Sequence, residues 1–211
     1  MKAVIFDLDG TLIDSMYVWA KADREFLSRF SIVPDDEYNR VISTLTFTEG
    51  VSYIKNRYNI NMSLEDIKKE LYNLAYNEYA YNIGLKSGVM EFLKGLRENN
   101  IKMGIATSCI SDMCFSVLKR IGIYDYFDAI VFSEDIGVNK NFPDIYVETA
   151  MRMGENIENC IVFEDVPHAV IGAKKSGAYV VGVYDEFSKD KKEEMLNICD
   201  RYIYSFDEIS L

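Results

Sequence analysis

Two aspartates, Asp7 and Asp9, follow directly after the short apolar run Ala3–Phe6. Carboxylates this close repel each other, which raises the pKa of a carboxyl group unless a cation lies between them. Oxygen ligands of this kind suit a hard divalent cation such as Mg²⁺. Gly10 then allows the backbone to turn sharply. Because turns favour Asp and Gly in any case, the pair alone also fits a solvated turn.

Three further polar groups follow other apolar runs in the same way. Thr107 and Ser108 could bind an anion with a hydroxyl and free amides, or could simply cap a helix. Lys140 lies in a loop before a helical pattern, where it could neutralise a phosphate or remain solvated. Glu164 and Asp165 form a second acidic pair, which is costly after an apolar run unless the carboxylates are paired or bind a metal.

The elements that must position these groups are short apolar runs separated by helical patterns. Most of the runs lack alternation, as strands buried on both faces do. Strands alternating with helices predict an α/β fold with a doubly wound parallel sheet. Ligands bind at the carboxyl ends of the strands in such sheets, so the four groups should converge there. The predicted strands are 3–6, 102–106, 129–132, 160–163, 179–183 and 202–204, and the main helical patterns are 88–98, 111–120, 143–153 and 169–175.

One stretch interrupts the alternation. Roughly ninety residues separate the first two strands, too many for one crossover helix. They carry helical patterns, and Ser63 with Asp66 three residues later predicts a capping box. We predict an all-helical cap domain at 15–83, inserted into a catalytic core of 1–14 and 84–211. Its predicted helices are 16–30, 47–58 and 63–81.

An aromatic stripe on the last of these helices leaves two interpretations open. Tyr72, Tyr76 and Tyr79 share one helical face. They could line a substrate cavity, although packing between helices is the commoner use of such a stripe.

The composition excludes several classes of protein. A net charge of −11 over 211 residues argues against general nucleic-acid binding, and weakly against binding to anionic membranes. The first apolar run is too short for a signal peptide or a membrane span. The four cysteines lack the spacing of a zinc site and fit reduced thiols. We therefore predict a cytoplasmic protein that acts on a small substrate.

The polar groups, taken in order, resemble the four motifs of the haloacid dehalogenase superfamily. The resemblance is to its phosphatase and beta-phosphoglucomutase branch, in which a small helical cap separates the first two motifs. Asn141 stands where the family usually has a proline. The matching motifs are Asp7–Thr11, Thr107, Lys140 and Glu164–Asp165.

The resemblance implies a phosphatase mechanism. Asp7 would attack phosphorus and form an aspartyl-phosphate, and Asp9 would act as general acid and then as general base. Asp7, the backbone carbonyl of Asp9, and Asp165 would bind Mg²⁺, with Glu164 supporting the metal or sharing the ligand role.

The remaining motif residues would bind the phosphate. Thr107, the Ser108 amide and Lys140 would hold the phosphoryl oxygens. The cap would close over the site to exclude water, with hinges near Asp14–Ser15 and near Gly84.

Within the family, the residues favour a phosphatase that acts on a small phosphorylated metabolite. Asp9 is present, which argues against a dehalogenase. Beta-phosphoglucomutases carry a cap histidine near the position of Trp19, whereas the only histidine here is His168. Two alternatives stay open: a beta-phosphoglucomutase-like isomerase, and a non-catalytic module that binds phosphate or metal on the same fold.

Overall fold

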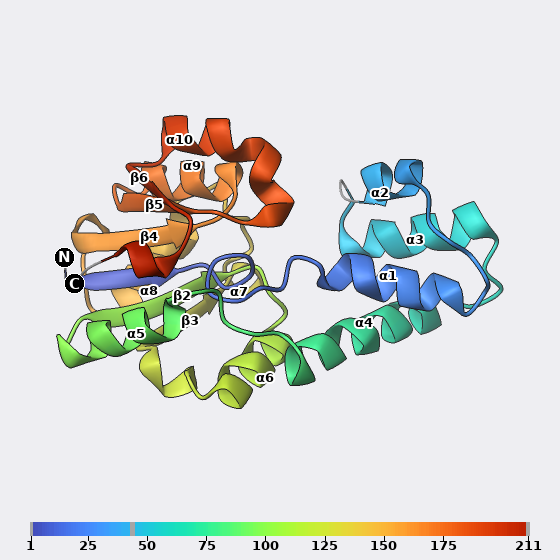
Figure 1. Ribbon diagram of the computed structural model, residues 1–211, viewed down its shortest axis with the longest axis horizontal. Helices are drawn as coiled ribbons and strands as arrows, with labels where there is room; N and C mark the ends of the chain where they lie inside the picture. The colour runs from blue at the N-terminus through green and yellow to red at the C-terminus, as the bar shows by residue number, and fades with distance from the viewer. Residues whose placement is uncertain (1, 43–44, 210–211) are drawn as a thin grey trace. The chain divides into compact units, whose positions relative to one another are not determined.

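The chain folds into two compact units, which are described separately (Figure 1). The computed structural model describes residues 2–42 and 45–209. Residues 1–16 and 83–211 form one unit, here called the sheet unit. Residues 17–82 form the other, here called the helical unit. The role of residues 15–83 as a cap stays a prediction.

The sheet unit is built on a six-stranded sheet with the order β3-β2-β1-β4-β5-β6. All neighbouring strands pair in parallel, which confirms the predicted α/β fold. β1 lies in the middle of the sheet, between β2 and β4. The strands are β1 Ala3–Phe6, β2 Lys102–Thr107, β3 Ala129–Phe132, β4 Cys160–Glu164, β5 Tyr179–Val183 and β6 Arg201–Ile203.

Both faces of this sheet are apolar, because successive residues of a strand point to opposite faces. Ile5 and Val162 belong to a buried cluster that includes Tyr146. The next residues along these strands, Phe6 and Phe163, stack at 5.2 Å in an aromatic cluster on the other face. Strands covered on both sides explain the continuous apolar runs in the sequence.

Helices supply the covering layers of the sheet unit. α8 packs against β1, β2 and β3, and α9 packs against β4 and β5. α5 contributes Phe92 to the aromatic cluster, with its ring 6.2 Å from that of Phe6. α7, α10 and the 3₁₀ turns were not predicted. The helices are α5 Val89–Glu98, α6 Ser111–Ile121, α7 Ser133–Ile136, α8 Asp144–Arg152, α9 Pro167–Lys175 and α10 Lys192–Ile198, and the 3₁₀ turns are η1 Tyr124–Tyr126, η2 Ile157–Asn159, η3 Glu186–Lys191 and η4 Phe206–Glu208.

The helical unit contains four α-helices among its described residues. α1 packs against α4, and α4 also contacts α3. α1 is shorter than predicted, and it is followed by a turn in which Ser31 has a left-handed φ of 58°. α2 was not predicted. The helices are α1 Val18–Ser28, α2 Asp36–Ile42, α3 Phe47–Tyr58 and α4 Leu64–Tyr81.

The start of α4 differs in one detail from the sequence prediction. Ser63 caps the helix by accepting a hydrogen bond from the Asp66 amide, as expected. The Asp66 carboxylate accepts from the Ser63 hydroxyl at 2.6 Å, so it does not complete the box through the Ser63 amide. A complete capping box occurs instead at α3, between Thr46 and Glu49, where the longer glutamate reaches the backbone.

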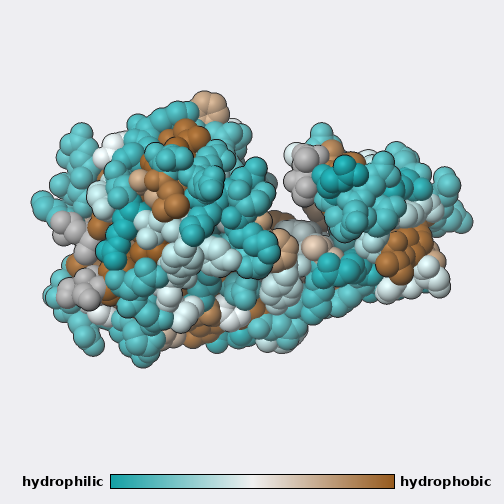
Figure 2. Space-filling view, turned by 45° about the horizontal axis from the view of Figure 1, so that its top comes forward, coloured by the Kyte–Doolittle hydropathy of each residue, from teal (hydrophilic) through white to brown (hydrophobic). Residues whose placement is uncertain are grey.

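Most of the surface that Figure 2 presents is hydrophilic, as the acidic composition predicts. On this face the hydrophobic residues form only small separate patches. No helix in the described part of the chain has the length and apolar character that a membrane crossing requires.

Candidate active site

The register between β1 and β4 brings the two acidic motifs together. Phe6 pairs with Phe163, and the Asp7 amide donates a hydrogen bond to the Phe163 carbonyl at 3.0 Å. Asp7 therefore leaves β1 beside Glu164 and Asp165 at the carboxyl end of β4. Carboxylate oxygens of these three residues lie within 4.8 Å of one another, and all three residues are buried.

Lys140 enters this acidic cluster from the loop before α8. Its Nζ lies 2.6 Å from Asp7 Oδ1 and 2.5 Å from Glu164 Oε1, and the residue is only 5% exposed. Gly172 on α9 allows the close approach of this loop, since a Cβ there would lie 1.9 Å from the Lys140 carbonyl oxygen. The third and fourth sequence motifs therefore meet the first in one buried cluster.

The cluster holds more negative than positive charge. Burial raises the pKa of both Glu164 and Asp165 above their usual values, and the charge of Asp7 adds to both shifts, while Lys140 opposes them. Burial would lower the pKa of Lys140, but its ion pairs with Asp7 and Glu164 raise it above its usual value. One ammonium does not balance the charge of three carboxylates, so binding of a further cation is electrostatically favourable.

Two oxygens of the cluster indicate where such a cation would fit. Glu164 Oε2 and Asp165 Oδ2 are buried and have no hydrogen-bond partner among the described residues. Buried carboxylate oxygens without partners are costly, and carboxylates are ligands that hard divalent cations prefer. The donor set of the acidic cluster therefore fits a divalent metal ion.

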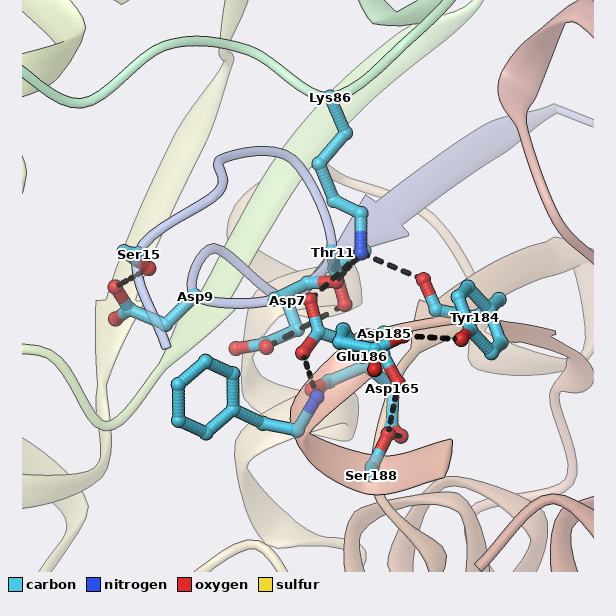
Figure 3. A network of polar contacts seen from close by, with 12 residues as sticks. Asp7, Asp9, Thr11, Ser15, Lys86, Asp165, Tyr184, Asp185, Glu186 and Ser188 are labelled. Carbon is cyan, nitrogen blue, oxygen red and sulfur yellow. Dashed lines mark hydrogen bonds and ion pairs between the residues drawn. The ribbon is translucent and has the colours of Figure 1, made fainter. Parts of the chain in front are cut away.

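Asp9 occupies a different position from the other acidic residues. Its side chain turns away from Asp7 and accepts a hydrogen bond from the Ser15 hydroxyl at 2.6 Å (Figure 3). The carboxylate of Asp9 is not a member of the acidic cluster. The predicted metal contact through the Asp9 backbone carbonyl stays a prediction.

The second motif ends the strand next to β1. Phe6 of β1 pairs with Ile105 of β2, so Thr107 ends its strand at the same edge of the sheet as Asp7. Thr107 is fully buried, and its Oγ1 accepts a hydrogen bond from the Cys109 amide at 3.0 Å. Ser108 is exposed, with its Oγ 2.9 Å from that of Ser133. Phosphate binding by Thr107 and Ser108 stays a prediction.

The sequence did not reveal the residue that supports Glu164. Tyr146 of α8 is fully buried, and its hydroxyl lies 2.8 Å from Glu164 Oε1 and 3.1 Å from the Ala169 carbonyl oxygen. Together with Lys140, it occupies Oε1 and leaves Oε2 free for a metal. In the sequence, Tyr146 resembles any aromatic residue on the apolar face of a helix.

The loop after β5 was also missed. Asp185 is buried and pairs with Lys86, and Ser188 donates a hydrogen bond to the Asp165 carbonyl at 3.0 Å (Figure 3). No motif or periodicity distinguishes these residues in the sequence. His168, in the first turn of α9, is exposed.

Comparison with protein families supports what the motifs suggested. The model of the haloacid dehalogenase-like hydrolase family matches residues 4–183. This range includes all of β1 except its first residue, the whole of β2 to β5, and every residue of the acidic cluster.

Individual relatives point to phosphate chemistry. The chain is 29% identical to a phosphorylated carbohydrates phosphatase of Thermotoga maritima, over 84% of this chain and 82% of that protein. It is 28% identical to a beta-phosphoglucomutase of Bacillus subtilis, over 87% of this chain and 83% of that protein. A crystal structure from Thermotoga maritima, provisionally assigned as a beta-phosphoglucomutase, superposes with a TM-score of 0.88 at 27% identity, over 99% of this chain and 96% of that one.

Proposed function

Because the chain belongs to the haloacid dehalogenase-like hydrolases, we propose that it is a Mg²⁺-dependent phosphatase that hydrolyses a small phosphorylated metabolite through an aspartyl-phosphate on Asp7. The observation that carries this proposal is the buried cluster of Asp7, Glu164 and Asp165, with the Lys140 ammonium directly on Asp7. The cluster joins a proposed nucleophile, a cation-binding set of carboxylates and a phosphate-binding lysine beside the carboxyl ends of β1 and β4.

Asp7 is the proposed nucleophile. Its carboxylate oxygen forms a bond to phosphorus while the bond from phosphorus to the leaving oxygen breaks. Lys140 bonds to Asp7 Oδ1 at 2.6 Å, and the Thr11 hydroxyl lies 3.5 Å from Oδ2. These contacts fix the direction of the carboxylate before the substrate arrives, which lowers the cost of reaching the reactive geometry.

Asp9 is the proposed general acid and base. In its protonated form it donates a proton to the leaving oxygen, and as a carboxylate it then accepts a proton from the water that hydrolyses the aspartyl-phosphate. The Ser15 hydroxyl, 2.6 Å from Asp9 Oδ1, orients this side chain.

The remaining motif residues hold charge. Asp7, Asp165, Glu164 and the backbone carbonyl of Asp9 would hold the Mg²⁺, which when bound neutralises charge on the phosphoryl oxygens. Thr107, the Ser108 amide and Lys140 would hold the other phosphoryl oxygens, on which the negative charge is spread.

The proposed substrate is a phosphorylated sugar or a phosphorylated polyol of similar size. We propose that the reaction takes place in the cytoplasm. The names of the relatives support this class, since one acts on phosphorylated carbohydrates. The beta-phosphoglucomutase relative keeps a phosphosugar isomerase as the second candidate. The sequence favours hydrolysis, because its only histidine is His168 and the helical unit has none.

The decisive experiment measures phosphate release from p-nitrophenyl phosphate and from a panel of phosphorylated sugars, with and without Mg²⁺. Asp7→Asn should abolish turnover while the circular dichroism spectrum stays unchanged. Asp125→Asn, which neutralises an exposed aspartate in η1, is the matched control and should keep full activity. Full turnover by Asp7→Asn would remove Asp7 as the nucleophile.

A second assay separates hydrolysis from isomerisation. Beta-glucose 1-phosphate is supplied, and glucose 6-phosphate and free phosphate are both quantified. Release of phosphate should dominate. Conversion to glucose 6-phosphate that outpaces phosphate release would favour the isomerase.

A further inference from the structure

Lys86 lies in a setting unusual for a lysine in a short connecting segment. It precedes α5 in the sheet unit, and its side chain is only 15% exposed. Its Nζ donates to the Gly10 carbonyl at 2.7 Å, to the Tyr184 carbonyl at 2.6 Å and to Asp185 Oδ2 at 2.8 Å. All three protons of the ammonium therefore have acceptors, which lie on the loops that follow β1 and β5 (Figure 3).

The acceptor Asp185 continues this network toward the acidic cluster. Asp185 is 3% exposed, and its Oδ1 accepts a hydrogen bond from the Phe187 amide at 2.9 Å, which fixes the start of η3. Within that turn, the Ser188 hydroxyl donates to the Asp165 carbonyl at 3.0 Å. The loop after β5 is thus bonded to Lys86 at one point and to Asp165 at another.

Gly10 closes the network from the other side. It has a φ of 81°, and a Cβ at this position would lie 2.3 Å from Asp165 Oδ2. The Gly10 backbone therefore lies directly against the carboxylate oxygen that has no hydrogen-bond partner among the described residues. A closed ring of contacts runs from Gly10 through Lys86, Asp185 and Ser188 to Asp165, and back to Gly10.

We propose that Lys86 is a positioning residue for the metal site: it holds the Gly10 turn and, through Asp185 and Ser188, the Asp165 backbone, so that the Asp165 carboxylate is presented to a divalent cation. This inference rests on the proposed function, because it assumes that the acidic cluster binds Mg²⁺. Lys86 touches neither the substrate phosphate nor the metal in this assignment.

The proposal can be tested because the charge of Lys86 and its positioning role have opposite effects on the affinity for Mg²⁺. A positive charge close to a cation site repels the cation, so its removal by itself would tighten Mg²⁺ binding. Loss of positioning acts in the opposite direction, because Asp165 would sample arrangements that do not bind the metal. Weaker binding after removal of Lys86 therefore cannot arise from the change in charge.

The test is the Mg²⁺ dissociation constant of the full chain, measured by isothermal titration calorimetry after treatment with EDTA. It is measured at a temperature at which circular dichroism shows each variant to be folded. Lys86→Met should bind Mg²⁺ about tenfold more weakly, which corresponds to about 1.4 kcal/mol. Lys86→Arg should recover part of the affinity, since it keeps the charge and the donors.

Lys174→Met is the matched control. Lys174 forms an ion pair with Asp200 at 2.7 Å, but its side chain is 38% exposed, and neither residue is part of the ring of contacts. Its Mg²⁺ affinity should stay within about twofold of the wild-type value, as expected for an exposed pair. Ser188→Ala is the second variant, and it decides the question if Lys86→Met does not fold, because it removes the hydrogen bond to the Asp165 carbonyl without changing any charge. It should also weaken Mg²⁺ binding, and an unchanged affinity would overturn the positioning of Asp165 by the loop after β5.

The outcomes separate this proposal from the metal site on which it rests. If the wild-type chain binds Mg²⁺ and Lys86→Met binds it equally well or more tightly, Lys86 is not a positioning residue. If the wild-type chain binds no Mg²⁺, the metal site itself is wrong, and the role of Lys86 is overturned with it.

Discussion

Buried carboxyl groups occur in both units, and their surroundings differ. In the sheet unit, Asp7 and Glu164 contact the Lys140 ammonium. In the helical unit, Asp23 of α1 is 8% exposed and accepts a hydrogen bond from the Tyr38 hydroxyl at 2.8 Å. Burial raises the pKa of Asp23 from its usual 3.8 to about 6, although the Tyr38 hydrogen bond opposes the shift. Asp23 therefore binds its proton more tightly in the folded protein than in the unfolded chain.

A pH dependence of stability follows at this residue. Between about pH 4 and pH 6 the folded state holds a proton on Asp23 that the unfolded state has lost, so the free energy of unfolding falls as the pH rises. A shift from 3.8 to about 6 corresponds to about 3 kcal/mol. Asp23→Asn should remove this contribution, because asparagine stays neutral and its side-chain carbonyl can accept the Tyr38 hydrogen bond.

Urea unfolding of both proteins from pH 4 to pH 7 provides the measurement. The two stabilities are subtracted at each pH, so that other titrating groups cancel. The difference should grow in favour of Asp23→Asn as the pH rises. A constant difference would mean that Asp23 titrates normally in the folded protein.

The residues with proposed catalytic roles could be selected from the sequence because of their places beside the predicted strands. Asp7, Thr107 and Asp165 stand at strand ends, and Lys140 lies in the loop before α8. Tyr146 and Lys86 could not be selected in this way, because an aromatic residue on a helix and a lysine in a connection are common and ordinary. Their roles depend on which atoms the folded register brings within hydrogen-bond distance, and no local pattern encodes that distance.

At the scale of elements, the parallel strands were predictable and several helices were not. Buried strands such as β1 and β4 have apolar runs that no other element explains as well. α2 and α10 are seven residues each, too short for a helical period to stand out. α2 also buries only Tyr38, so it has no apolar stripe to recognise.

The packing of α9 gives a prediction at this scale. Gly172→Ala would place a Cβ 1.9 Å from the Lys140 carbonyl oxygen, so the helix or the Lys140 loop must shift. We expect the free energy of unfolding to fall by about 1–3 kcal/mol. We also expect kcat to fall, because Lys140 would lose its position on Asp7. Chemical denaturation and steady-state kinetics measure the two effects.

Gly84→Ala is the stability control for this variant. A Cβ at Gly84 would meet nothing within 4 Å, and its backbone is not left-handed. Its stability should stay within about 0.5 kcal/mol of the wild-type value. Equal effects of the two substitutions would mean that α9 accommodates a methyl group without moving the loop.

At the scale of the whole molecule, the net charge of −11 and the acidic cluster favour a bound cation. Mg²⁺ that binds only the folded chain at about one hundred times its dissociation constant adds about 2.7 kcal/mol of stability. For a protein of this size the melting temperature should rise on the order of 5–10 °C, and EDTA should reverse the rise.

Variants assign this thermal shift to the cluster. Asp165→Asn should lose most of the shift, whereas Asp125→Asn should retain it. Differential scanning calorimetry of all three proteins, with and without Mg²⁺, makes the comparison. An equal shift in Asp165→Asn would mean that the ion stabilises the protein from another place.

The central position of β1 has a consequence for how the chain is made. β1 leaves the ribosome before the other five strands of this sheet, and its two neighbours, β2 and β4, begin only at Lys102 and Cys160. Residues 17–82 are all synthesised before either partner strand exists. The helical unit can therefore fold while β1 still has no strand to pair with. The nascent chain therefore carries Asp7 long before Glu164 and Asp165 are added, and the acidic cluster can form only after β4 has emerged.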